Sequence, residues 1–258
     1  MLRLFAKSQD ISGGRIKLSA EDSEHIRSLR LRPDELFVIC DGEGADYVCR
    51  LGARYDGTAA GTEGSFADIV LKRQSLGEPS IACTVYIAYS KGESLDYAVQ
   101  KSVELGAHGI VLYKANRCVA VPGNVQKKTE RLQRIALESA KQCGRGLIPV
   151  VTDGGNFKTA VDLSTQRSAL SLLFYEGEDY LHIKEVLEQN FSSFREREEY
   201  KISTISVITG PEGGFEPAEV ELAKSKGICA VSLGSRILRA ETAPVVALSA
   251  IMFHTGNL

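Results

Sequence analysis

The stretch that decides the fold class is ISTISVITGPEGGFEPAEVELAKS, residues 202–225. Its opening segment, 202–209, is apolar and rich in β-branched side chains, which predicts a strand. The turn that follows, GPEGG at 210–214, lets backbone groups approach a ligand without obstruction by a Cβ atom. Pro217 suits the first turn of a helix, although Glu216 is an unusual N-cap and gives only half of a capping box. The stretch therefore predicts a strand, an open turn and a helix in succession.

The same succession extends outward through most of the chain. One helix is predicted after an S-x-x-E capping box at Ser90 and Glu93 and is closed by Gly106. A long basic helix is predicted from a cap at Asn124 to Cys143. Alternating strands and helices imply an α/β fold with a mostly parallel sheet that helices cover on both faces. The other elements predicted are strands at 81–88, 110–113, 169–175 and 228–233 and an apolar terminal helix at 244–254.

The first part of the chain has a different pattern. Short apolar segments separated by turns rich in Gly and Asp predict a small β-barrel that holds one helix at 20–31. The polar segment 72–80, which contains a glycine and a proline, is the expected boundary. We therefore expect a β-rich domain at 1–71, a linker at 72–80 and the α/β domain at 81–258. The strands expected in the first domain are 15–18, 36–40, 47–51 and 69–71.

Composition excludes several classes of protein. The N-terminus is charged and holds no signal-peptide pattern, and no stretch reaches the ~20 apolar residues of a membrane span. We therefore expect a cytoplasmic protein that does not associate with a membrane. The six cysteines are scattered and the four histidines lie far apart, so we expect neither a metal site nor a disulfide scaffold. Reduced, mostly buried thiols fit this spacing better.

The distribution of charge favours an anionic partner. The formal net charge is only −2, yet residues 114–145 hold eight basic and two acidic side chains, and residues 176–199 reverse the balance. Such asymmetry suits a protein with one face for an anion. A solvated face with no partner is the alternative.

Three turns between a strand and a helix, at 173–177, 208–215 and 233–244, stand where ligands gather in a parallel sheet. None matches the G-x-x-x-x-G-K-[ST] or G-x-G-x-x-G patterns of phosphate and dinucleotide binding, and the spacing indicates no Ser-His-Asp triad. The residues alone predict an α/β enzyme with a ligand pocket lined by backbone and with a basic face. Ordinary tight turns remain the alternative.

Two of these turns, TGPEGGF at 209–215 and LGSRILRAETA at 233–243, together resemble the signature of the ribosomal RNA small subunit methyltransferase E family, in the SPOUT class of knotted methyltransferases. The resemblance extends over essentially the whole chain. It departs from the family at Asp34, where a glycine is usual, and at Ser28, which replaces a valine. Further segments similar to the family are His25, SLRLRP at 28–33, SKGE at 90–93, QKSVELG at 100–106, NR at 116–117, ESAKQCGR at 138–145 and IP at 148–149.

The resemblance implies a PUA-like β-barrel, an RNA-binding domain, followed by a SPOUT domain with a deep trefoil knot, in a homodimer. It implies S-adenosylmethionine as the cofactor and methylation of uridine N3 in small-subunit (16S) ribosomal RNA, either naked or in the assembled 30S subunit. Arg239 is expected beside the cofactor, where it would stabilise negative charge on the uracil; an ion pair with Glu241 or Glu212 is its alternative role. The residues expected around the cofactor are Phe174, Tyr175, Glu176, Thr209, Gly210, Pro211, Glu212, Gly213, Gly214, Leu233, Gly234, Ile237, Leu238, Arg239, Thr242 and Ala243.

Phosphate contacts are expected from basic side chains in both domains, with plain surface charge as the alternative at each position. Three other functions stay open: a ribose 2′-O-methyltransferase of the same class that acts on transfer RNA, a non-catalytic RNA-binding factor in ribosome assembly, and a metabolic α/β enzyme. The expected RNA contacts are Arg3, Arg27, Arg30, Arg32, Lys91, Arg117 and Arg145.

Overall fold

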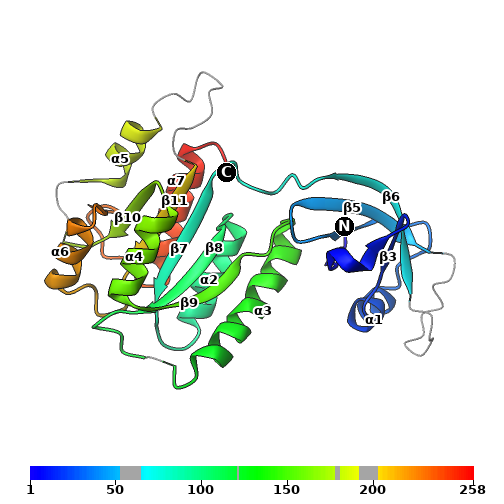
Figure 1. Ribbon diagram of the computed structural model, residues 1–258, viewed down its shortest axis with the longest axis horizontal. Helices are drawn as coiled ribbons and strands as arrows, with labels where there is room; N and C mark the ends of the chain where they lie inside the picture. The colour runs from blue at the N-terminus through cyan, green and yellow to red at the C-terminus, as the bar shows by residue number, and fades with distance from the viewer. Residues whose placement is uncertain (53–64, 121, 178–180, 192–202) are drawn as a thin grey trace. The chain divides into compact units, whose positions relative to one another are not determined.

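The computed structural model describes residues 1–52, 65–120, 122–177, 181–191 and 203–258. The chain divides into two compact units (Figure 1). Unit 1 comprises Met1–Glu78 and Ala140–Ile148, and unit 2 comprises Pro79–Ser139 and Pro149–Leu258.

Unit 1 is built on a six-stranded sheet in the order β1-β4-β5-β6-β3-β2. Among the strands that the structure describes, the β1–β4 pair is parallel and the other pairs are antiparallel. The N-cap of helix α1 (Ala20–Ser28) is Ser19, whose side chain accepts a hydrogen bond from the backbone N–H of Asp22. Its buried Ile26 joins a core with Ile16 and Phe37. The strands are β1 (Arg3–Phe5), β2 (Ile11–Ser12), β3 (Arg15–Lys17), β4 (Phe37–Cys40), β5 (Ala45–Leu51) and β6 (Phe66–Gln74).

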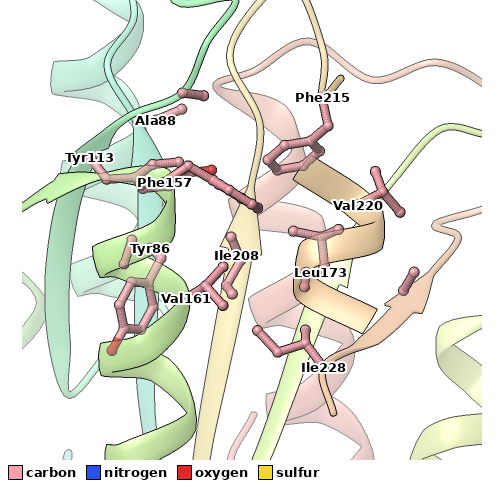
Figure 2. Packing of buried hydrophobic residues seen from close by; sticks show 14 of the residues in the cluster. Tyr86, Ala88, Tyr113, Phe157, Val161, Leu173, Ile208, Phe215, Val220 and Ile228 are labelled. Atoms are coloured by element: carbon pink, nitrogen blue, oxygen red, sulfur yellow. The ribbon is translucent and has the colours of Figure 1, made fainter. Parts of the chain in front are cut away.

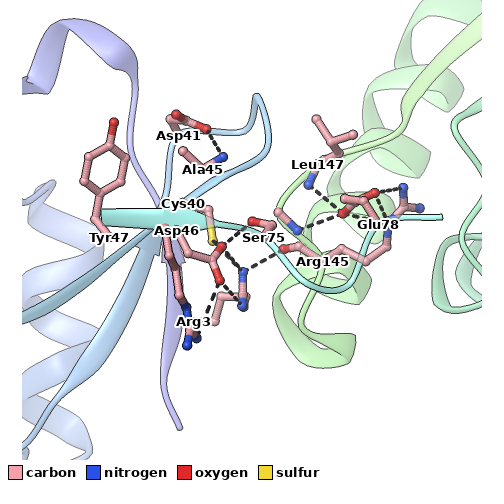
Figure 3. A network of polar contacts seen from close by, with 12 residues as sticks. Arg3, Cys40, Asp41, Ala45, Asp46, Tyr47, Ser75, Glu78, Arg145 and Leu147 are labelled. Carbon is pink, nitrogen blue, oxygen red and sulfur yellow. Dashed lines mark hydrogen bonds and ion pairs between the residues drawn. The ribbon is translucent and has the colours of Figure 1, made fainter. Parts of the chain in front are cut away.

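The boundary differs from the expected linker at 72–80. Strand β6 continues to Gln74, and the first unit extends to Glu78. Unit 1 also takes in Ala140–Ile148, which begins in the last turn of α3 (Val125–Cys143). The Glu78 carboxylate holds this segment, accepting hydrogen bonds from the backbone of Gly146 at 2.8 Å and of Leu147 at 3.0 Å (Figure 3). Glu78 and Gly146 lie far apart in the sequence, so no local sequence pattern could predict this contact.

Two arginines expected to contact RNA instead stabilise the interior of unit 1 (Figure 3). The Arg3 guanidinium donates two hydrogen bonds, at 2.8 and 2.9 Å, to Asp46, whose side chain is 1% exposed. Arg145, with a side chain 3% exposed, pairs with Glu78 at 2.7 Å. A phosphate would have to break a buried ion pair to reach either side chain, so the structure does not support the RNA contacts expected at Arg3 and Arg145.

Unit 2 contains a sheet of six parallel strands in the order β12-β10-β11-β7-β8-β9. Helices α2 and α7 pack on each other and on β7, while α4 packs across β8 to β11 on the opposite face together with α6 (Figure 1). The predicted parallel sheet covered on both faces is confirmed. The strands are β7 (Ala82–Ala88), β8 (Gly109–Lys114), β9 (Val150–Asn156), β10 (Leu170–Phe174), β11 (Thr204–Thr209) and β12 (Cys229–Val231). The helices besides α3 are α2 (Ser94–Glu104), α4 (Phe157–Arg167), α5 (Ile183–Asn190), α6 (Pro217–Ser225) and α7 (Thr242–His254).

The core of unit 2 reaches the carboxyl ends of the strands (Figure 2). Tyr113 packs against Phe157, with ring centroids 5.9 Å apart, and Phe157 packs against Phe215 at 5.5 Å. Phe215 closes the glycine-rich turn after β11 and is 4% exposed. The turn is therefore anchored to the core by its last residue.

Two predicted details of unit 2 have different outcomes. The cap at Asn124 is confirmed, because its side chain accepts the backbone N–H of Lys127 at 2.8 Å. The capping box at Ser90 and Glu93 is wrong, since α2 begins at Ser94 and its N-cap, Glu93, makes no side-chain capping bond. Residues 90–93 form a turn in which Gly92 has a φ of 60°.

Among the described residues, no helix is both long and apolar enough to cross a membrane.

Candidate functional site

A cavity of about 790 Å³ lies where three neighbouring strands of unit 2 end. The turns that leave β10, β11 and β12 supply most of its walls, which places it at the carboxyl edge of a parallel sheet. Its volume is in the range of about 300–1,000 Å³ typical of small-molecule sites. The predicted residues that line it are Phe174, Tyr175, Glu176, Gly210, Pro211, Glu212, Gly214, Leu233, Gly234, Ile237, Leu238, Arg239 and Ala243.

Three predicted residues, Thr209, Gly213 and Thr242, lie beside the cavity and not on its wall. Thr209 is fully buried, and its carbonyl accepts a hydrogen bond from the Tyr113 hydroxyl at 2.8 Å. Thr242 begins α7 and donates its backbone N–H to the carbonyl of Arg239 at 2.9 Å. Thr209 and Thr242 therefore form hydrogen bonds beside the cavity without lining it themselves.

Further lining residues were not predicted individually. Most of them lie inside the two quoted motifs or next to them, so the sequence pointed to their segments. Ser94 and His182 come from the starts of α2 and α5, where no local pattern indicated a ligand. The complete set of additional lining residues is Ser94, His182, Phe215, Ser232, Ser235, Arg236, Ala240 and Glu241.

The turn after β11 needs its glycines for steric reasons. A Cβ on Gly210 would lie 3.0 Å from the Phe215 ring, and one on Gly213 would lie 2.9 Å from the Cβ of Arg117. Gly214 has a φ of 67°, in the left-handed region that favours glycine, and a Cβ there would lie 2.9 Å from Glu176 Oε1. The glycines at 210, 213 and 214 therefore suit a turn in which a Cβ atom would crowd its neighbours.

The turns after β7 and β8 hold the glycine-rich turn from outside. The backbone N–H of Lys91, after β7, donates to Glu212 Oε1 at 2.9 Å. Arg117, after β8, donates to the carbonyl of Gly213 at 3.4 Å and lies 4.0 Å from Glu216. Both basic residues were expected to contact RNA, and both are exposed at this edge of the sheet.

The charged groups of the cavity are of both signs. Arg236 and Arg239 come from the turn after β12, and carboxylates come from Glu176, Glu212 and Glu241. The Arg239 side chain is 86% exposed, and its only described ion-pair partner is Glu241 at 3.9 Å, a long contact that leaves most of the guanidinium free. Such a site can bind a ligand that carries both charges and still offer a cation to a second molecule.

In the part of the chain that the structure describes, no three His, Cys, Asp or Glu side chains are grouped so that they could hold a metal ion.

The remaining cations expected to contact RNA lie in unit 1. Arg27 is in the last turn of α1, and Arg30 and Arg32 follow it. All three side chains are exposed, and Arg30 has a φ of 53°, which is uncommon for a residue other than glycine. Their exposure leaves them available to phosphates, in contrast to Arg3 and Arg145.

Comparison with known proteins identifies the family. A family model described as an RNA methyltransferase domain matches residues 77–252. The ribosomal RNA small subunit methyltransferase E of Synechocystis is 31% identical over 96% of this chain and 76% of that protein. This chain belongs to the ribosomal RNA small subunit methyltransferase E family. The family's Bacillus subtilis member is 29% identical over 98% of this chain and 96% of its own length.

A solved structure of a family member has the same fold. The ribosomal RNA small subunit methyltransferase E of Neisseria gonorrhoeae, crystallised with bound S-adenosyl methionine, superposes with a TM-score of 0.78. The two chains are 26% identical, and the match covers 98% of this chain and 97% of the other. Both units therefore belong to the family's architecture.

Proposed function

We propose that this protein transfers a methyl group from S-adenosylmethionine to N3 of a uridine in 16S ribosomal RNA. The observation that carries the proposal is the cavity formed by the turns after β10, β11 and β12, in a chain that belongs to this family. The family name of its relatives supports the RNA substrate, and the relative crystallised with S-adenosyl methionine supports the cofactor.

The residues of the cavity fit this cofactor. S-adenosylmethionine supplies a methyl group bonded to a positively charged sulfur. The glycines of the turn after β11 leave backbone N–H and C=O groups open to a ligand, as a cofactor with many polar atoms requires. Glu176 and Glu212 supply negative charge on the wall, which favours a cationic ligand.

Arg239 is the residue that we propose acts on the substrate. N3 lies on the pairing edge of uracil, so the base must be unpaired or turned out of a stack before it can enter the site. The base must also lose its N3 proton, which leaves negative charge on the ring. A largely free guanidinium on the wall of the cavity can stabilise that charge as it develops.

The resemblance to the methyltransferase E family also implies what kind of domain each unit is. We propose that unit 1 is a PUA-like domain that docks RNA through Arg27, Arg30 and Arg32, and that unit 2 carries the deep trefoil knot of the SPOUT class. Tracing the chain in an experimental map of unit 2 with S-adenosylmethionine bound would test the knot. An unknotted trace through the turn at 233–241 would refute it.

We further propose that the protein is a homodimer that works in the cytoplasm, where ribosomal subunits are found. Helix α7 supports the dimer, because it is apolar on more than its buried side and exposes 77% of Phe253. Light scattering should give twice the 28.0 kDa mass of the chain, and the mass of a single chain would refute the dimer.

Nucleoside mass spectrometry tests the reaction. Small subunits that lack the modification are incubated with the protein and methyl-labelled S-adenosylmethionine, and fully modified subunits serve as the matched control. Labelled 3-methyluridine at one site in the unmodified subunits alone is the expected result. Label in ribose would indicate 2′-O-methylation, and cofactor binding without transfer to any RNA would indicate a non-catalytic assembly factor.

A further inference from the structure

Glu219 is a buried carboxylate beside the glycine-rich turn, and it is not part of the cavity wall. It stands in the first turn of α6, and the residue is 4% exposed. A buried carboxylate needs hydrogen-bond donors for its oxygens, because burial removes them from water. The donors that it uses show what it does.

Both oxygens of Glu219 accept backbone N–H groups. Oε2 accepts from Glu216 at 2.9 Å, and Oε1 accepts from Asn116 at 2.9 Å. Within the described residues, no lysine, arginine or histidine pairs with this carboxylate. The positive end of the α6 dipole, at its first turn, favours a negative charge here.

The two donors belong to segments far apart in the sequence. Glu216 directly follows the glycine-rich turn, and Asn116 lies in the turn after β8, one residue beyond Ala115. The Asn116 side chain adds a hydrogen bond of 2.8 Å to the Glu216 carboxylate. One buried group therefore ties the end of the β11 turn to the turn after β8.

This tie fixes the outer side of a segment whose inner side forms the cavity. Gly213 rests on Arg117, the residue after Asn116, with so little space that a Cβ would lie 2.9 Å away. Its neighbours Glu212 and Gly214 line the cavity. If the turn after β8 separated from the turn after β11, the wall that meets the cofactor would lose its support.

We propose that Glu219 is a positioning residue for cofactor binding, because it holds the turn at 210–215 in its binding shape by accepting the backbone N–H groups of Glu216 and Asn116. This inference rests on the proposed use of S-adenosylmethionine. It assigns a role in that reaction to a residue that does not touch the cavity. The same tie also fixes the backbone that presents Arg117 at the edge of the sheet.

The test is the variant Glu219→Gln, with Glu221→Gln as the matched control. A glutamine side chain has one acceptor oxygen, so one of the two backbone donors loses its partner. Glu221 lies on the same helix and is exposed. Calorimetric titration should give a dissociation constant for S-adenosylmethionine raised about tenfold in Glu219→Gln and unchanged in Glu221→Gln.

Kinetics separate positioning from a general loss of structure. At saturating S-adenosylmethionine, kcat of Glu219→Gln should return to within about twofold of the unchanged protein, while KM for the cofactor stays raised. A lower melting temperature with unchanged cofactor affinity and KM would overturn the proposal and leave Glu219 a purely structural residue.

A shorter carboxylate gives a second test if Glu219→Gln does not fold. Glu219→Asp keeps the charge but cannot reach both backbone donors, so it should also weaken cofactor binding, and unchanged binding would overturn the proposal. The unchanged protein is titrated first. If the unchanged protein binds no S-adenosylmethionine, the proposed function itself fails. If the unchanged protein and its variants bind it equally well, only the role proposed for Glu219 fails.

Discussion

Replacing Gly214 by alanine tests whether the shape of the glycine-rich turn determines cofactor binding. Gly214 lines the cavity and has a φ of 67°. Gly227, after α6, is a matched control because its φ is 81° and a Cβ there would meet nothing within 4 Å. The two substitutions impose the same kind of backbone strain, but only the one at Gly214 also places a Cβ 2.9 Å from Glu176 Oε1.

The magnitude follows from the strain. An L-residue in the left-handed region costs about 1–2 kcal/mol. Alanine also restricts the unfolded chain, which offsets about 0.4–1 kcal/mol of that cost. We therefore expect each variant to lose about 1 kcal/mol of unfolding free energy and about 2–4 °C in melting temperature.

The effects on cofactor binding should differ. In Gly214→Ala the turn relaxes to relieve its strain and Glu176 moves away, so binding must restore the shape at a cost of about 1.4 kcal/mol, a tenfold rise in Kd. Gly227→Ala should bind S-adenosylmethionine as the unchanged protein does. Calorimetric titration beside thermal unfolding measures both quantities. Equal cofactor affinity in the two variants, with equal loss of stability, would refute the reasoning.

Three further predictions concern charged groups. Arg239→Ala should lower kcat by about 10²–10³-fold with cofactor affinity unchanged, and unaltered turnover in a single-turnover assay would contradict its role. Burial alone would raise the pKa of Asp46, but hydrogen bonds, first of all from Arg3, outweigh it and hold that pKa below its ordinary value. The ionised carboxylate therefore stabilises the fold above pH ~4, and this stabilisation is lost as the pH falls through the lowered pKa. In Asp46→Asn the free energy of unfolding should fall less steeply at acid pH, as measured by denaturation at a series of pH values. An equally steep fall in the variant would exclude Asp46 as its source. Replacing Arg27, Arg30 and Arg32 together by glutamine should reduce the slope of log affinity for RNA against log salt by about 0.7–0.9 for each phosphate that is no longer neutralised, whereas an identical slope would remove them from the interface.

The sequence by itself determined the α/β class and the segments that form the cavity. Strand and helix periodicity are local, so the parallel sheet of unit 2 could be predicted. The glycines at 210, 213 and 214 were informative for the same reason, because a turn that admits no Cβ atom restricts the residue type at each position. The arginines at 27, 30 and 32 were expected to contact RNA, and all three are exposed, as such a contact requires.

Only the tertiary structure decided which charges are buried and which segments meet. Arg3 and Arg32 are the same residue type, yet Arg3 pairs with the buried Asp46 while Arg32 stays exposed. The tie from Glu219 to Asn116 and the tie from Glu78 to Gly146 join residues widely separated along the chain. Burial and pairing depend on which distant segments pack together, and local propensity carries no information about partners at that range.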